Sequence, residues 1–172
     1  MTDPIVIVDY DPGWPAEFER LRDRTAAAVG ELAIAVEHVG STAVPGLAAK
    51  PVIDLVVVVA PIDVGRAVER LVAIGYTHLG NLGVEGREAF SVPPGEPRHH
   101  HLYVSPTNSE ELRAQLAFRD NLRADAALAA DYEALKRQLA ERYRNDRPGY
   151  TDAKTEFVTR ASRSSAPASP SP

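Results

Sequence analysis

Hydrophobic positions repeat with two different periods along the chain, and each period predicts its own kind of element. Short alternating or β-branched runs predict strands at 5–8, 32–39, 52–59, 76–79, 87–92 and 98–104. Apolar positions three and four residues apart predict amphipathic helices over 15–30 and 63–74, then from Asn108, from Asp125 and from Thr151 to Arg160. This order predicts an α+β fold, with a mixed β-sheet, helices packed on one side and a C-terminal helical segment.

The length of the chain, 172 residues, suggests one domain, which we expect to span residues 1–160. Residues 161–172 are rich in Ser, Pro and Ala, a composition that predicts a disordered tail. Hydrophobic residues make up 44% of the sequence and charged residues 25%, as is ordinary for a globular protein with a proper core. The absence of cysteine excludes disulfides, cysteine-ligated zinc and thiol catalysis.

The ends and the charge of the chain predict a cytoplasmic protein without a membrane or general nucleic-acid partner. The N-terminus has no basic segment followed by a long apolar run, so we do not expect a secretory signal. The longest apolar run, 55–60, is far too short to span a bilayer. A net charge of −5 argues against general nucleic-acid binding. Almost all basic residues are arginines, and the only lysines are Lys50, Lys136 and Lys154.

A carboxylate interrupts the most apolar predicted strand. Asp54 lies between Ile53 and Leu55, where an ionised group is costly unless it is paired or binds a cation. A loop rich in Gly, Ser and Thr followed by such a strand is one way to build a phosphate and metal site, with Asp54 as the metal ligand. The alternative is that Asp54 caps a turn or pairs with Lys50 or an arginine.

The loop before this strand carries four candidate phosphate ligands: Gly40, Ser41, Thr42 and Lys50. Glycine lets a backbone approach a ligand closely, and successive amides with two hydroxyls can cradle phosphate oxygens. Pro51 biases Lys50 toward an extended conformation. Lys50 is then either a phosphate ligand or one partner of a surface ion pair.

The predicted strand at 98–104, RHHHLYV, is unusually polar. Strand alternation places His99, His101 and Tyr103 on one face. Two histidines two residues apart on a strand can chelate a transition metal, hydrogen-bond a phosphate or simply pack. No second carboxylate lies close by in the sequence to complete a metal site.

Several motifs resemble the GrpB family. The signature of that family is similar to HVGSTAVPGL at 38–47 followed by AKPVIDL at 49–55. The DPGW motif at 11–14 resembles its N-terminal segment, and FRDNLR at 118–123 with YEALK at 132–136 resembles its C-terminal helices. The resemblance covers about residues 4–160. Because the family is similar to the nucleotidyltransferase superfamily of DNA polymerase beta, the resemblance implies a nucleotidyltransferase-like fold.

The resemblance also implies roles for the residues of the loop and the strand. In that superfamily a Gly-Ser turn precedes a strand with two metal-binding carboxylates one residue apart. Gly40 and Ser41 match the turn, and Asp54 matches the first carboxylate, so Asp54 is expected to bind Mg²⁺. Ser41, Thr42 and Lys50 are expected to hold the phosphates of a nucleoside triphosphate.

Three further polar residues are candidates for the same chemistry. His101 and Arg87 are expected to orient the acceptor or to stabilise developing charge in the transition state. Arg98 is the third, either in that role or as a further phosphate ligand. All three lie in the second half of the predicted sheet, beyond the loop that carries the signature.

The chain departs from the superfamily pattern at the second carboxylate. Position 56 is Val56, whereas two-metal transfer relies on paired acids to hold two magnesium ions. Either one metal suffices, with Glu37 or His101 completing the site, or catalysis has been lost. Tyr103 stands where the family pattern leads us to expect histidine, and a tyrosine hydroxyl is a poorer metal ligand or base near neutral pH.

Two functions remain open at this point. The first is a nucleotide-dependent transferase or ligase that uses Mg²⁺ and a nucleoside triphosphate and acts on a small molecule. The second is a non-catalytic module that binds a nucleotide or a partner, for example an accessory to dephospho-coenzyme A kinase in coenzyme A biosynthesis. A GrpB-like domain is fused behind that kinase in some bacteria, which motivates the second hypothesis.

Overall fold

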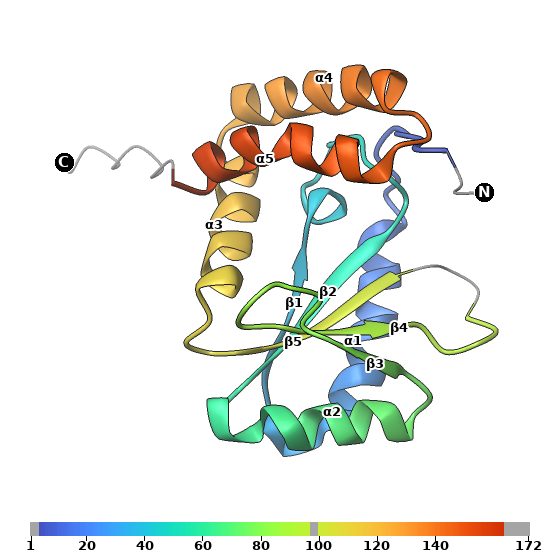
Figure 1. Cartoon of the computed structure of the whole chain (residues 1–172), viewed down its shortest axis with the longest axis vertical. Coiled ribbons are helices and arrows are strands. Elements are labelled where there is room, and N and C mark those ends of the chain that lie inside the picture. The colour runs from blue at the N-terminus through green and yellow to red at the C-terminus, as the bar shows by residue number, and fades with distance from the viewer. Residues whose placement is uncertain (1–3, 97–99, 164–172) are drawn as a thin grey trace.

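The computed structural model describes residues 4–96 and 100–163. A five-stranded mixed sheet with the order β1-β2-β5-β4-β3 forms its centre, as predicted (Figure 1). Strands β2 and β5 run parallel, whereas β1 with β2, β5 with β4 and β4 with β3 run antiparallel. The strands are β1 (Ala33–Val39), β2 (Ile53–Val59), β3 (Thr77–Gly80), β4 (Glu88–Ser91) and β5 (His100–Pro106).

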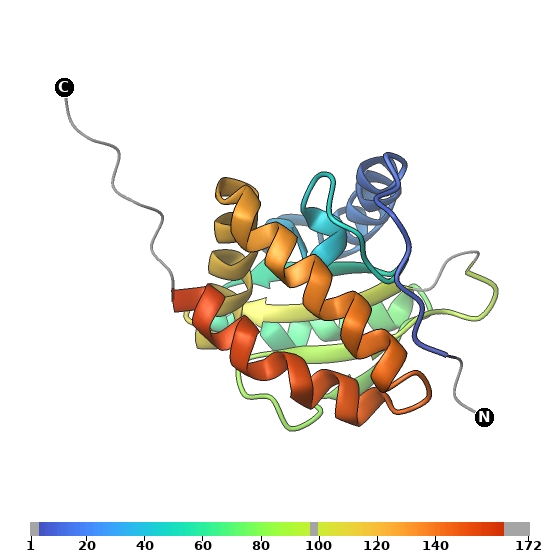
Figure 2. The same cartoon turned by 90° about the horizontal axis from the view of Figure 1, so that it is seen from above.

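Helices cover both faces of this sheet and lie at two opposite ends of the molecule. The helices are α1 (Trp14–Val29), α2 (Val64–Ala73), α3 (Glu110–Ala124), α4 (Ala126–Arg142) and α5 (Arg147–Arg163). Helices α4 and α5 lie side by side across one end of the molecule, and α2 lies at the opposite end (Figure 1). Seen from above, α4 and α5 pass over the strands (Figure 2). The predicted α+β fold with a C-terminal helical segment is therefore confirmed.

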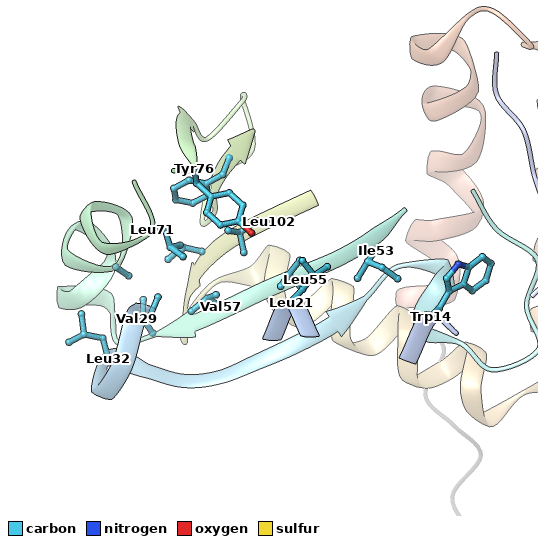
Figure 3. Packing of buried hydrophobic residues seen from close by; sticks show 14 of the residues in the cluster. Trp14, Leu21, Val29, Leu32, Ile53, Leu55, Val57, Leu71, Tyr76 and Leu102 are labelled. Carbon is cyan, nitrogen blue, oxygen red and sulfur yellow. The ribbon is translucent and has the colours of Figure 1, made fainter. Parts of the chain in front are cut away.

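One face of β2 forms the main hydrophobic core. Leu55 and Val57 are fully buried and pack with Trp14 and Leu21 of α1 and with Leu71 of α2 (Figure 3). The alternation of the strand places these side chains on one face, and the apolar stripes of the two helices cover them. This core fixes β2, and with it the position of Asp54.

The other face of β2 packs against the C-terminal helices. Val56 and Val58 form a smaller cluster with Leu112 at the start of α3. A separate cluster joins Val44 and Leu47, in the loop between β1 and β2, to apolar residues of the three C-terminal helices. The C-terminal helices thus hold the loop that carries the family signature.

The predicted strand at 5–8 is wrong. This segment is extended but forms only a single β-bridge, between Val8 and Ala49. The amide of Ile5 donates to the carbonyl of Arg144 at 2.8 Å, so its partner is the end of α4 rather than the sheet. A β-branched run that packs against a loop and a helix end has the same composition as a strand, which explains the error.

Two predicted helix starts also shift. Ser109, rather than Asn108, caps α3, because its hydroxyl accepts a hydrogen bond from the amide of Leu112 at 3.1 Å. Helix α5 begins at Arg147, four residues before Thr151, since a proline in the first helical turn costs no hydrogen bond.

Helix α5 also extends beyond the predicted end of the domain. It continues to Arg163, and Ala161 is buried in it, so the first residues of the predicted tail belong to the folded part. The rest of that tail lies outside the described residues.

Candidate functional site

The parallel pairing of β2 with β5 places Asp54 beside His101. The Oδ1 atom of Asp54 accepts a hydrogen bond from His101 Nδ1 at 2.6 Å. The Asp54 side chain is 28% exposed and that of His101 is 42% exposed, so the pair lies at a surface rather than in the core. A carboxylate bound to one ring nitrogen fixes the orientation and the tautomer of a histidine, an arrangement typical of a general base.

Gly40 follows β1 directly and touches this pair. Its φ of +74° lies in a region that side chains rarely adopt, and a Cβ there would overlap Oδ2 of Asp54. The strand register explains the contact, because Val39 is paired with Asp54. The glycine of the Gly-Ser turn therefore makes room for the protein's own carboxylate.

The two hydroxyls after Gly40 differ in their surroundings. The Thr42 hydroxyl is buried, lies 2.9 Å from His38 Nε2 and donates to the carbonyl of Val52 at 3.3 Å. It thereby ties the turn to the start of β2. Ser41 lines a cavity and hydrogen-bonds the hydroxyl of Tyr132.

A cavity of about 420 Å³, which we call the cation cavity, opens beside Ser41 and Asp54 and reaches α4 and α5. Residues of the loop between β1 and β2 and of strands β2 and β5 form one wall, and the two helices form the other. Its lining residues are Ser41, Thr42, Lys50, Val52, Asp54, His101, Tyr103, Lys136, Arg147, Tyr150, Thr151 and Lys154.

All three lysines of the chain line the cation cavity. Lys50 comes from the loop, Lys136 from α4 and Lys154 from α5, and Arg147 at the start of α5 adds a fourth cation. Of these four cations, only Lys50 was predicted from the sequence to be a phosphate ligand. The rarity of lysine among 19 basic residues was the available signal for the other two.

Burial and mutual repulsion perturb these lysines. Burial lowers the pKa of Lys136 to about 7, and the charge of Lys154 adds to the shift. Burial also lowers the pKa of Lys154 to about 8, followed by the charge of Lys50. The pKa of Lys50 is lowered by burial and by the charge of Arg147, while Asp54 opposes the shift. Cations held this close together favour an anionic ligand, which would relieve both costs.

Long-range contacts hold the signature loop against the helices. Arg123 of α3 donates to the carbonyl of Ala43 at 2.8 Å. The amide of Ala48 donates to the carboxylate of Glu133 at 2.9 Å, and Lys136 donates to the carbonyl of the same alanine. Backbone groups of the loop are thus satisfied by side chains of α3 and α4, and the loop does not depend on its own turns alone.

The structure brings six of the predicted site residues together and places two others, Arg87 and Glu37, elsewhere. Gly40 contacts the Asp54 carboxylate, and the other five, including His101, line the cation cavity. Arg87 lies elsewhere, with its guanidinium 4.8 Å from the centre of the Tyr103 ring and 3.9 Å from Glu111. Arg98, like His99 of the predicted histidine pair, lies outside the described residues.

The second residue outside the cation cavity is Glu37, a predicted metal ligand. Its carboxylate accepts from Arg119 of α3 at 2.6 Å. This ion pair neutralises the carboxylate, which is not among the groups that line the cation cavity. The assignment of Glu37 to the metal remains a prediction, and a metal ligand there would have to displace Arg119.

The donor groups at the cation cavity do not fit a resident two-metal centre. Val56, at the position of the second carboxylate, is fully buried in an apolar cluster. Asp54 already accepts from His101 and faces four cations. Within residues 4–96 and 100–163, no group of three or more His, Asp or Glu side chains could hold a metal ion.

Within the same ranges, no helix is long and apolar enough to cross a bilayer.

Comparison with known proteins finds relatives over nearly the whole chain. The family described as GrpB protein matches residues 4–164. A glutamate-rich protein GrpB of Alkalihalophilus pseudofirmus is 33% identical over 159 residues, which cover 90% of this chain and 91% of that protein.

Two other relatives are longer than this chain. The UPF0157 protein YqkA of Bacillus subtilis is 34% identical over 158 residues, and the match covers 91% of this chain but 46% of YqkA. A dephospho-CoA kinase of Mycolicibacterium paratuberculosis is 33% identical over 187 residues, which cover 93% of this chain and 46% of the kinase. The chain therefore spans about half the length of these two relatives.

Solved structures extend the comparison to the fold. The crystal structure of the conserved protein GrpB from Enterococcus faecalis matches with a TM-score of 0.81 and 34% identity, covering 91% of this chain and 94% of that one. Cid1 in complex with the UTP analog UMPNPP matches with a TM-score of 0.54 and 17% identity, covering 79% and 43%. At this identity Cid1 shares the nucleotidyltransferase-like fold alone. The matches across residues 4–164 show that the chain belongs to the GrpB family.

Proposed function

We propose that this protein is a nucleotide-dependent transferase or ligase that acts on a small molecule, and that the cation cavity binds a nucleoside triphosphate. The observation that carries the proposal is the convergence of three lysines and Arg147 beside the Asp54–His101 pair. A triphosphate carries several negative charges, which matches this cluster and offsets the cost of burying it.

Two kinds of lining residue would bind the phosphates, cationic side chains and a hydroxyl. Lys50, Lys154 and Arg147 surround the cavity with positive charge and would neutralise the phosphate oxygens. The Ser41 hydroxyl lies at the strand wall, where it can donate to the phosphate nearest Asp54. Because these groups sit on the loop and on α5, closing both on the ligand would also exclude water.

The Asp54–His101 pair would act as the general base. Asp54 orients the imidazole, which takes the proton from the hydroxyl or amine of the acceptor as that group attacks the α-phosphorus. The bond from this phosphorus to the bridging oxygen breaks, and pyrophosphate leaves. The cations of the cavity stabilise the charge that develops on the phosphate oxygens.

Magnesium would arrive with the triphosphate as part of the substrate, as Mg·NTP. Asp54 is the described carboxylate at the cavity that could add one protein ligand to such an ion. A solved structure of Cid1, which shares the fold of this chain, has MgGTP bound. The proposal for this protein rests on its own cations.

The test is thermal unfolding with each of the four ribonucleoside triphosphates, with and without Mg²⁺. A ligand that binds only the folded protein raises the Tm by mass action. We expect a rise for at least one triphosphate that is lost in Lys154→Met and Lys50→Ala. Arg113→Ala, which removes an exposed cation of α3 outside the cavity, should keep the full rise.

Lysine labelling gives an independent readout. Because all three lysines line the cavity, an amine-reactive ester can modify only these side chains and the N-terminus. A bound triphosphate should protect Lys50 and Lys154, as measured by mass spectrometry. Equal labelling with and without any triphosphate, together with no Tm rise, would contradict the proposal.

A second function is favoured by one comparison. The relationship with a dephospho-CoA kinase, of which the match covers 46%, is consistent with a domain that assists such a kinase without its own chemistry. In that case a triphosphate would bind, but no acceptor would release pyrophosphate. Purified protein would instead change the activity or stability of the kinase, and Asp54→Asn would leave that effect unchanged.

A further inference from the structure

A second cavity lies on the other side of Asp54. Its volume is about 240 Å³, and it shares Asp54 and Tyr103 with the cation cavity. Apolar walls come from Val39 at the end of β1, from Phe118 of α3 and from Val158 of α5. We call this space the apolar chamber.

Helix α5 lines both spaces with one face. Arg147, Thr151 and Lys154 line the cation cavity, and Val158 and Ser162 line the apolar chamber. These five residues follow one another at intervals of three and four, so they share a face of the helix. That face changes from cationic to apolar between Lys154 and Val158, and Figure 2 shows the helix lying across the strands.

The charge of the two spaces is opposite. Among the described residues that line the apolar chamber there is no lysine or arginine, and its carboxylates are Asp54 and Glu111. Arg87 faces Glu111 from outside at 3.9 Å and offsets part of its charge. An anion would be repelled here, whereas a neutral or cationic molecule would not.

We propose that the apolar chamber is the acceptor subsite, and that it takes a small, non-anionic molecule with an apolar body and a hydroxyl or amine nucleophile. This inference rests on the proposed function, because it assigns the second substrate of that reaction. The volume equals about eight water molecules at ~30 Å³ each, which limits the acceptor body to a short chain or a single ring.

The orientation of the acceptor follows from the shared residues. The nucleophile has to point toward Asp54 and Tyr103, where the two spaces meet, and toward His101 in the cation cavity, where the α-phosphorus would lie. A new N–P or O–P bond forms, the bond to the bridging oxygen breaks with release of pyrophosphate, and the proton of the nucleophile goes to the His101 imidazole. The apolar body remains against Phe118 and Val158, away from water.

The experiment uses three probes of one length: hexylamine, hexanol and hexanoate. Their binding to the ATP-loaded protein is followed by saturation-transfer NMR at millimolar concentration. We expect signals from hexylamine and hexanol and a much weaker one from hexanoate. A hexanoate signal as strong as the others, or no signal from any of the three, would overturn the assignment.

Two matched variants locate the binding. Ala114 is an exposed residue of α3 that lines the apolar chamber, and Ala130 is an exposed residue of α4 that lines a different groove. Ala114→Leu should abolish the hexylamine signal by filling the chamber, whereas Ala130→Leu should leave it unchanged. Loss in Ala130→Leu, or an unchanged signal in Ala114→Leu, would overturn the proposal.

A last measurement tests the orientation and separates the two proposals. With Mn·ATP in place of Mg·ATP, the protons next to the nitrogen of hexylamine should relax faster than those of its terminal methyl group. The reverse order would overturn the assignment as an acceptor subsite. ATP should raise the Tm of both alanine variants as it does that of the wild type. If none of the four ribonucleoside triphosphates raises the Tm of any of these proteins, the proposed function fails, while the chamber's preference for non-anionic ligands is judged by the probes alone.

Discussion

The two faces of β2 lie in different surroundings, one in the apolar core and the other beside a charged cavity. One face carries Leu55 and Val57, buried against α1 and α2 in a wholly apolar cluster. The other carries Asp54, which bonds His101 and faces the cations of α4 and α5. The first face stabilises the fold, because burial of apolar surface is its driving force. The second concentrates charge at a loss of stability, which natural proteins accept where a ligand binds.

Substitutions on the two faces should therefore differ most in stability. Leu55→Ala deletes a fully buried side chain and should lower the free energy of unfolding by about 3–5 kcal/mol. Asp54→Asn, one residue away, should change it by less than about 1 kcal/mol, since the side chain is part-exposed. Urea denaturation followed by circular dichroism measures both. Equal losses would break the comparison between the faces.

The core face could be predicted from the sequence because its signal is local. The alternation of 52–59 and the spacing of the helix residues after Trp14 are repeated patterns that neighbouring residues reinforce. The same local reasoning found the Gly40–Asp54 part of the site, since the turn and the strand are close in the chain. It failed at 5–8, where β-branched residues pack against a loop instead of pairing.

The rest of the site depends on contacts that no local pattern encodes. Lys136 and Lys154 reach the cavity only because α4 and α5 pack across the end of the sheet. Glu37 accepts a hydrogen bond from Arg119, which lies 82 residues further along the chain. A residue type that is rare in the chain and gathers in one place is a signal, but only the fold shows where it gathers.

Gly40, which follows β1 and lies against the Asp54 carboxylate, should be the next position most sensitive to substitution. Gly40→Ala forces a side chain into a positive-φ conformation and against Asp54, and should cost about 2–4 kcal/mol. Gly46→Ala, also at positive φ but with open space around it, should cost only about 1 kcal/mol. Denaturation and triphosphate binding measured together would show whether only Gly40→Ala also loses the ligand.

The charged face should reveal itself in the pH dependence of stability. Burial lowers the pKa of Lys136 to about 7 in the folded protein, from an ordinary value near 10.5. Between these values the unfolded chain binds more protons at this site than the folded one, so stability should rise as the pH increases from 7 toward 10. Lys136→Met removes this proton uptake, and we expect its stability to rise by about 3 kcal/mol less over that range. Identical pH profiles of stability for the wild type and Lys136→Met would contradict the lowered pKa of Lys136.

The smallest effect should separate two neighbouring hydroxyls of the signature loop. The Thr42 hydroxyl serves the fold through Val52 and His38, so Thr42→Val should cost about 1–2 kcal/mol of stability and little triphosphate affinity. Ser41 lines the cavity, so Ser41→Ala should cost less than about 1 kcal/mol of stability, the part due to Tyr132, but weaken triphosphate binding about tenfold. Calorimetric titration measures the triphosphate affinity of both variants, and denaturation measures their stability. A loss of triphosphate affinity in Thr42→Val rather than in Ser41→Ala would contradict the assignment of Thr42 to the fold and of Ser41 to ligand binding.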